Sequence, residues 1–166
     1  MGLPAKILPG FSATLYAQPG AIGTVVPLST ANLSTLNSVS AIAISANLVP
    51  VEAIPAFGQD DAVASFMVAG SRQSDKIPVQ SAPTSMSITA AWNPSDTVLV
   101  LLRTDAYNGT VDRTYVIAAS DGSNTIYYAF NGRVSQWTID AAPGAEAKAN
   151  FTIHPRGNQY GWSNTV

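Results

Sequence analysis

Few residues in this sequence belong to the types that carry out catalytic chemistry. The chain has one histidine, His154, and no cysteine. A serine–histidine–aspartate arrangement is possible by residue type, but no nucleophile elbow supports it. With one histidine and no thiol, a zinc site is not expected. We therefore interpret His154 as a solvated residue near the end of a strand.

The carboxylates also form no recognisable motif. Asp60-Asp61 could begin a calcium loop, yet the spaced oxygen ligands of such loops do not follow. Asp105 and Asp112 flank a turn, where aspartate is common for backbone reasons. No glycine-rich phosphate loop occurs. The sequence therefore predicts a protein that is not an enzyme, with no catalytic, cofactor-binding or metal-binding residues and no cofactor.

The composition is unusually low in charge. Charged residues make up 11% of the chain, against about a quarter in an average domain, while apolar residues make up 46%. One interpretation is a β-protein whose surface is polar without being charged. The other is that much of the surface is buried against copies of the same chain. The net charge of −2 and the absence of a Lys/Arg run argue against a surface that grips nucleic-acid phosphates.

The length, 166 residues, is that of a single domain. We expect a flexible N-terminal arm over about residues 1–10 and a C-terminal tail over about 155–166, because both are rich in glycine, proline or asparagine and lack periodicity. The first ten residues lack the apolar run of a signal peptide. No stretch approaches a membrane span, so membrane insertion is not expected.

The clearest local pattern begins at Thr84. Residues 85–92 alternate between apolar and small polar types, which is typical of a half-buried strand. The apolar face holds Met86, Ile88, Ala90 and Trp92. The opposite face holds Ser85, Ser87, Thr89 and Ala91. We expect the first face to lie in the core of a sheet and the second to stay polar.

A short helix is predicted directly after this strand, over about residues 96–107. Pro94 fixes its own backbone angle, and Ser95 or Asp96 can cap the first free N–H groups. The apolar run that follows favours a buried face. Asn108-Gly109 supplies a left-handed stop. No other stretch predicts a helix as clearly.

A second alternating stretch runs from Val39 to Val49. Ile42, Ile44, Ala46 and Leu48 would share one face, and Ser45 and Asn47 would lie on the other. Further strands are predicted at 11–16, 113–119, 125–130, 134–139 and 146–154. A turn at 121–124 would join two of them. Asn131-Gly132 is either another turn or a bulge in a continuing strand.

Residues 50–78 differ from the rest. Prolines and glycines interrupt them, and an apolar patch lies in the middle. We interpret the segment as a protruding loop or hairpin, because long structureless loops are uncommon in compact domains. The alternative is an ordinary core strand from Ala62 to Val68. In a protruding segment, Phe57, Phe66 and Met67 would be exposed and would need a partner.

Two short motifs carry a resemblance to a known family. The first is the Ala-Ala-Trp, Pro, helix junction within Ala90–Leu102, and the second is the Phe-x-Gly-x-Val-Ser strand at Phe130–Ser135. With the order of strands around them, they resemble the tail tube proteins of long, flexible-tailed bacteriophages, over roughly residues 38–154. Compared with fuller members of that family, we expect this chain to lack the immunoglobulin-like C-terminal domain.

The resemblance implies a mainly β fold, an antiparallel sandwich or barrel with one flanking helix. Six copies would form a ring, and rings would stack into a tube that DNA crosses without specific binding. The protein would belong to the virion tail and assemble in the host bacterial cytoplasm. Its partners would be copies of itself together with tape measure, tail terminator and distal tail proteins. Such a tube would contain copies buried against one another, which agrees with the low charge.

Particular residues follow from this resemblance. An inter-ring loop would include Phe57, Asp60, Asp61, Phe66 and Met67. The lumen wall would include Ser45, Asn47, Ser85, Ser87 and Thr89. A wall of small, uncharged or slightly acidic residues would let DNA slide, because a basic wall would hold its phosphates.

Other functions stay open at this point. One is the inner tube of a contractile injection machine, which uses the same ring-forming fold. Another is a secreted carbohydrate-binding β-sandwich, in which Tyr160 and Trp162 would stack on sugar. A third is a small hydrolase that uses His154.

Overall fold

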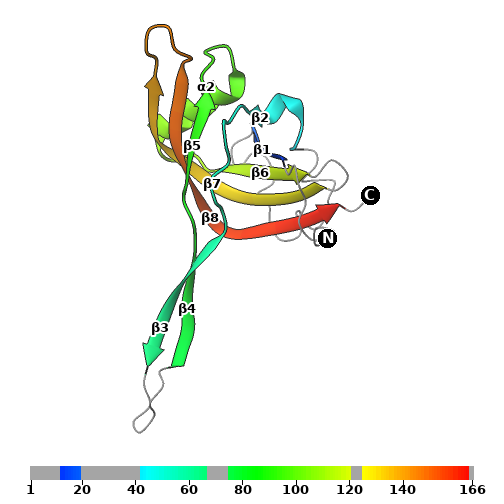
Figure 1. The fold of residues 1–166 in the computed structure, drawn as a ribbon, viewed down its shortest axis with the longest axis vertical. Coiled ribbons are helices and arrows are strands. Elements are labelled where there is room, and N and C mark those ends of the chain that lie inside the picture. Colours follow the sequence, from blue (N-terminus) through cyan, green and yellow to red (C-terminus); the bar gives the residue numbers. More distant parts are fainter. Residues whose placement is uncertain (1–11, 20–41, 67–74, 121–124, 165–166) are drawn as a thin grey trace, which may run out of the picture.

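The computed structural model describes residues 12–19, 42–66, 75–120 and 125–164. Six strands form one antiparallel sheet in the order β2-β1-β6-β7-β8-β5, and β3 and β4 pair separately. In Figure 1 the six-stranded sheet curls, and the β3–β4 hairpin projects along the long axis. The elements are β1 (Ser12–Ala17), the 3-10 helix η1 (Ser45–Asn47), β2 (Leu48–Val49), β3 (Gln59–Phe66), β4 (Asp75–Pro83), β5 (Met86–Ala91), α2 (Thr97–Asn108), β6 (Arg113–Ser120), β7 (Thr125–Asp140) and β8 (Lys148–Asn164). The predicted fold class, mainly β with one flanking helix, is confirmed for these residues.

The long strands β7 and β8 form the middle of the sheet. β6 and β7 pair up to Ser120 and Thr125, which agrees with the predicted hairpin, although its turn at 121–124 lies outside the described residues. β7 does not end at Asn131-Gly132. It continues to Asp140, and its register with β8 shifts between Ala129 and Asn131. The interpretation of this site as a bulge is therefore confirmed, and the alternative turn is wrong.

Gly132 is required by the packing at this bulge. A Cβ atom there would stand 3.1 Å from the backbone oxygen of His154 and 3.1 Å from Cγ2 of Ile153. Such contacts are tighter than most real Cβ contacts, so a side chain at this position would require Ile153 and the β8 backbone to move by a few tenths of an ångström. Figure 1 shows β8 changing direction between its first half, beside β5, and its second half.

The pattern predicted for β5 is confirmed. Met86, Ile88 and Ala90 are at most 2% exposed, whereas Ser85 and Ser87 are exposed. β5 pairs antiparallel with the first half of β8, whose own buried residues alternate in the same way. Trp92, just past the strand, is partly buried and packs edge to face against Trp137 at 5.7 Å between ring centroids.

The helix α2 begins and ends where its caps predict. The side chain of Asp96 accepts hydrogen bonds from the backbone N–H groups of Val98 and Leu99, at 2.9 and 3.1 Å. Gly109 ends the helix with a φ of 64°, in the left-handed region. Val98, Leu99 and Leu102 are buried against the sheet. The helix therefore covers the same sheet face that holds Met86, Ile88 and Ala90.

The strand predicted over Val39–Val49 is wrong for Ile42–Asn47. Residues 42–44 form a turn, η1 follows, and only Leu48 and Val49 pair as a strand. The side chain of Asn47 donates from Nδ2 to the carbonyl oxygen of Ile42 at 3.0 Å. This local bond closes a compact turn, which competes with an extended backbone. Ile44 is consequently 48% exposed and outside the core where the alternation placed it.

The predicted C-terminal tail is also wrong, because β8 runs through it as far as Asn164. Its second half pairs with the start of β7, with Asn164 opposite Thr125. Glycine and asparagine made this stretch look unstructured, but the neighbouring strand supplies its backbone partners. The predicted arm at 1–10 lies outside the described residues.

A buried ion pair joins α2 to the sheet. Arg113 at the start of β6 contacts both carboxylate oxygens of Asp105, and both side chains are 5% exposed. Arg113 also donates to the carbonyl oxygen of Pro19, just past β1. Burial, and next the negative charge of Asp105, raise the pKa of the neighbouring Tyr115 far above its ordinary range. One arginine thus connects the helix, β6 and the end of β1.

We expect Asp105→Asn to destabilise the fold by about 3 kcal/mol, because it leaves the buried guanidinium without its counter-charge. Urea unfolding followed by circular dichroism measures this. The double variant Asp105→Leu, Arg113→Met removes both charges and should recover most of the loss. A single variant within about 0.5 kcal/mol of the wild type would show that the pair does not fix the helix.

Candidate assembly surfaces

The first candidate surface lies on β5, the first half of β8 and the second half of β7, on the side that points away from α2; we call it the polar face. Side chains alternate across a strand, so the neighbours of the buried residues in these strands share this face. Its residues are Ser85, Ser87, Thr89, Arg133, Ser135, Asn150, Thr152 and His154. Three predicted wall residues, Ser85, Ser87 and Thr89, therefore lie together.

Hydrogen bonds cross the strands of the polar face. Nδ1 of His154 lies 2.8 Å from Oγ of Ser85, and Nε2 lies 2.7 Å from Oγ of Ser135. In a neutral imidazole one nitrogen donates and the other accepts, so the ring can serve both hydroxyls. Thr89 donates to Oδ1 of Asn150 at 2.8 Å. His154 thus connects β7 to the residue just before β5, whereas the sequence predicted only a solvated residue near the end of a strand.

This arrangement lacks the parts of a catalytic triad. His154 has a serine on each ring nitrogen, where a triad places an orienting carboxylate on one side.

Among the described residues no group of three or more His, Cys, Asp and Glu side chains could hold a metal ion. In the same part of the chain, no helix is long and apolar enough to cross a membrane.

The cations at the border of the polar face are paired. Asp112 binds Arg133 through Oδ1 at 2.7 Å and Arg156 through Oδ2 at 2.8 Å. Arg133 also donates to the carbonyl oxygens of Gly109 and Thr110, which lie at the end of α2. No local pattern in the sequence indicates this cluster, because its members lie far apart in the chain.

Lys148, at the start of β8, pairs with Glu52 at 2.5 Å. The hydrogen bond that Lys148 donates to this carboxylate, and then the negative charge of Glu52, raise the pKa of Lys148. The polar face therefore combines hydroxyl and amide groups with cations that each have a carboxylate partner. This differs from the slightly acidic wall expected from the sequence.

The two remaining predicted wall residues lie elsewhere. Ser45 and Asn47 belong to η1, and the side chain of Asn47 is turned inward, at 6% exposure. They appeared to share a strand face with Ser85 only because residues 39–49 alternate. The structure does not bring them to the polar face, so we leave them out of it.

The second candidate surface is the β3–β4 hairpin. It pairs from Gln59 with Pro83 to Phe66 with Asp75, and its register shifts beside Val63. Ala62–Ser65 are exposed, and Val63 is 54% exposed. The alternative of a core strand at Ala62–Val68 is therefore wrong for these residues.

The predicted loop residues divide into three groups. Asp60, Asp61 and Phe66 lie on β3. Met67 lies outside the described residues. Phe57 precedes the hairpin and packs against Tyr128, with ring centroids 5.0 Å apart, so it is not the exposed loop residue predicted.

At the two ends of the strand order, part of the sheet edge is covered or short. Beside β5, the N–H of Glu52 donates to Thr89 and the N–H of Ala91 donates to Pro50, both at 2.9 Å. At the opposite edge, β2 has only two residues. Short or covered edges limit uncontrolled strand pairing.

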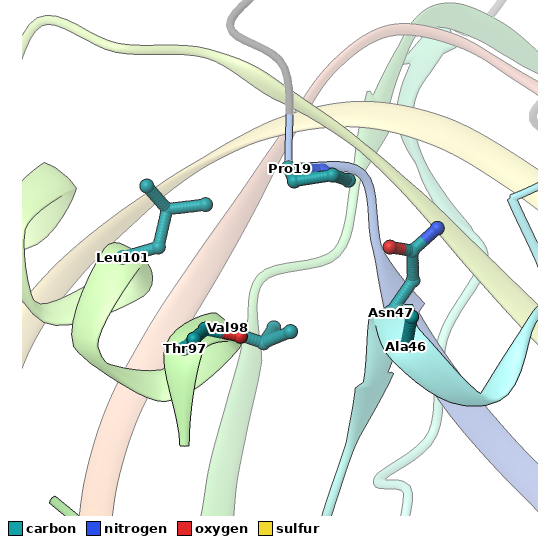
Figure 2. Close-up of a pocket in the computed structure, with 6 residues that line it drawn as sticks. All are labelled: Pro19, Ala46, Asn47, Thr97, Val98 and Leu101. Atoms are coloured by element: carbon teal, nitrogen blue, oxygen red, sulfur yellow. The ribbon is translucent and has the colours of Figure 1, made fainter. Parts of the chain in front are cut away.

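The third candidate surface is a groove between α2 and η1, with a volume of 320 Å³. Figure 2 shows Val98 and Leu101 on the helix, Ala46 and Asn47 on the opposite side, and Pro19 between them. Thr97 completes the lining. Sequence reasoning missed this groove, since it depends on η1, where a strand was predicted.

No family model matches this sequence, and no characterised protein matches it in a sequence search. The fold does have solved counterparts. A chain of the anti-feeding prophage baseplate (six-fold symmetrised) aligns over 98% of this chain and 97% of its own length, with a TM-score of 0.62 and 9% identity. A chain of the SPP1 tail tube aligns over 93% and 78%, with a TM-score of 0.56 and 9% identity. The expected fold of tail tube proteins is thus confirmed at the level of architecture.

We expect His154→Ala to lower stability by less than about 1 kcal/mol, because water can replace its bonds to two partly accessible serines. Thermal unfolding measures the effect, and Ser87→Ala on the same face is the matched control. We also expect assembly to be unchanged. Ester hydrolysis by the wild type that disappears in His154→Ala would contradict the non-catalytic interpretation.

Proposed function

We propose that this chain is the structural subunit of a phage-type tail tube, assembled as stacked hexameric rings around a channel for DNA, and that it is not an enzyme. The observation that supports this most is the likeness of nearly the whole chain to chains of a prophage baseplate and of a phage tail tube. At 9% identity that likeness concerns the fold, so the assignment of function needs the surfaces as well.

The surfaces agree with this assignment. Along β5, the first half of β8 and the second half of β7, one side of the sheet belongs to the core cluster that contains α2, and the other, the polar face, carries hydroxyl, amide and paired charged groups. We propose that the polar face lines the channel, with Ser85, Ser87 and Thr89 in its wall. The hairpin projects beyond the core that the chain builds for itself. An isolated hairpin is at best marginally stable in water, so contact with another copy would stabilise it.

The polar face also suits a channel for DNA. Unpaired cations on a channel wall would neutralise DNA phosphates and release their counterions, so such a wall would bind DNA. Here Asp112 forms ion pairs with both Arg133 and Arg156, and Glu52 forms one with Lys148. Phosphates passing this face would meet cations that are already neutralised. In this proposal the tape measure, tail terminator and distal tail proteins would be further partners, and the assembled protein would belong to the virion.

A second candidate is the inner tube or baseplate subunit of a prophage-type injection machine. The higher TM-score with the anti-feeding prophage baseplate chain favours it. Both candidates share the ring-forming role, and they differ in whether a contractile sheath surrounds the tube.

Negative-stain microscopy and sedimentation of the purified chain test the proposal. We expect rings or tubes with a central channel, formed increasingly at higher protein concentration. A chain that stays monomeric at millimolar concentration would overturn the assignment.

Shortening the hairpin should separate folding from assembly. The design replaces Ala62–Gln80 with Asn-Gly, which joins the paired residues Asp61 and Ser81 by a two-residue turn. We expect unchanged far-ultraviolet circular dichroism and a melting temperature within a few degrees, because the removed residues whose burial is described, Ala62–Ser65, are all exposed. Tube formation should be lost, whereas Ala64→Ser should still assemble. Loss of folding would show that the hairpin belongs to the core.

Asp112→Asn should make the assembled protein bind DNA. Removing this carboxylate frees Arg133 and Arg156, so the slope of log K against log salt should steepen by about one to two. Fluorescence anisotropy with a short duplex measures the slope. Glu146→Gln is the charge-matched control, because Glu146 is exposed in the β7–β8 turn. Equal slopes in both variants would place the polar face away from the DNA path.

A further inference from the structure

The imidazole of His154 lies on the polar face between two hydroxyl groups. Its Nδ1 is 2.8 Å from Oγ of Ser85, and its Nε2 is 2.7 Å from Oγ of Ser135. A neutral imidazole has one N–H, so it donates to one serine and accepts from the other. The hydroxyl hydrogen of that second serine is therefore used by the ring and is not available to a ligand.

Protonation of this ring would change both its charge and its hydrogen bonds. An imidazolium has two N–H donors and no acceptor, so both serines would accept from it. Both hydroxyl hydrogens could then be donated to another group. The site would thus gain one positive charge and one free hydroxyl donor, which are the groups that bind an anion. Histidine side chains ordinarily take up this proton between pH 8 and about pH 5.

The neighbouring side chains leave no acid to neutralise an imidazolium at this position. In the described part of the chain, neither ring nitrogen of His154 is paired with a carboxylate. The residue opposite it on β7 is Arg133, and the next alternate residue of β8 is Arg156. Both guanidinium groups already share the carboxylate of Asp112. A proton on His154 would therefore need a counter-charge from outside the chain.

The remaining elements beside His154 supply no nearby charge either. β5, which follows Ser85 directly, contains no titratable side chain. The strand before it, β4, has Asp75 and Lys76, which lie at the end of the hairpin away from Ser85. The charge of this part of the polar face therefore depends on the protonation of His154.

Resting on the proposed function, in which the polar face lines the channel, we propose that this face contains an acid-dependent site for the phosphodiester group of DNA. The protonated imidazole of His154 and the hydroxyls of Ser85 and Ser135 form it. Arg133, opposite His154 and with 32% of its side chain exposed, adds a guanidinium group. Phosphate oxygens accept strong, charge-assisted hydrogen bonds from such cations. The wall would let DNA slide at neutral pH and would hold it in mild acid.

Three variants isolate the effect of the proton. His154→Gln keeps a donor and an acceptor for the two serines but carries no charge at any pH. His154→Lys carries a positive charge throughout the range in which histidine titrates. Ser87→Ala, on the same face, is the matched control. The probe is a short fluorescent oligothymidylate, whose charge is constant in this range.

Fluorescence anisotropy measures binding of this probe to the full chain, kept dilute so that it does not assemble. The measurements are made at about pH 7.5 and about pH 5.5, on either side of the ordinary titration of histidine. One added phosphate contact steepens the slope of log K against log salt by about 0.7 for a single strand, which is about fivefold in affinity at about 0.1 M salt.

We expect the wild type and Ser87→Ala to bind the probe at least about fivefold more tightly at the lower pH, because one phosphate contact is gained. His154→Gln should bind weakly at both pH values, and His154→Lys should bind tightly at both. No gain in the wild type, or an equal gain in His154→Gln, would overturn the site. So would a His154→Lys variant that binds as weakly as His154→Gln.

Assembled tubes separate this site from the proposed function. The same measurement is repeated on tubes with a short duplex. A gain that depends on His154 in the dilute chain, without any gain in the tubes, would support the site and overturn the placement of the polar face in the channel. Failure of the wild type to form rings or tubes would overturn the tail-tube assignment, and the measurement on the dilute chain would still decide the site.

Discussion

The position of α2 depends on one ion pair that is excluded from water. Arg113 and Asp105 are each almost fully buried, and the arginine also reaches the carbonyl oxygen of Pro19. Such a pair contributes little net stability compared with well-packed apolar residues, but losing one partner is expensive. Its main physical effect here is on the position of α2, because any displacement that separates Asp105 from Arg113 would leave a buried charge without its partner. The bonds of Arg133 to the end of the helix, and the groove beside its first turns, both follow from that placement.

Successive side chains of a strand point to opposite faces, so the two faces of the sheet can have different chemical character. In β5 and the first half of β8, alternate side chains belong to the same core cluster as α2, which also includes the stacked rings of Trp137 and Phe151. The alternate side chains are bound to each other across strands and leave few free charges. A single sheet can therefore contribute a dry core on one side and a wet, weakly charged surface on the other. The proposed channel needs both properties in the same strands.

Features set by local chemistry could be predicted from the sequence. Asp96 and Gly109 define α2 through bonds within a few residues, and the alternation of β5 agrees with its burial. Features set by distant partners could not. His154 meets Ser85 across 69 residues, and Asp112 joins Arg133 and Arg156 across 21 and 44. At Ile42–Asn47 a side-chain bond outweighed the alternation, and after Pro155 the pairing with β7 outweighed a composition typical of a tail.

The direction of the strands has a mechanical consequence. Figure 1 shows β4 and β5 following one another along the long axis, with the first half of β8 beside β5. β5 and β8 pair over six residues, and the hydrogen bonds of an antiparallel ladder run perpendicular to its strands. A pull on the hairpin along this axis would load those bonds in shear, all together, instead of opening them one after another from an end. The hairpin is thus attached to the domain in the orientation in which a β-ladder resists tension best.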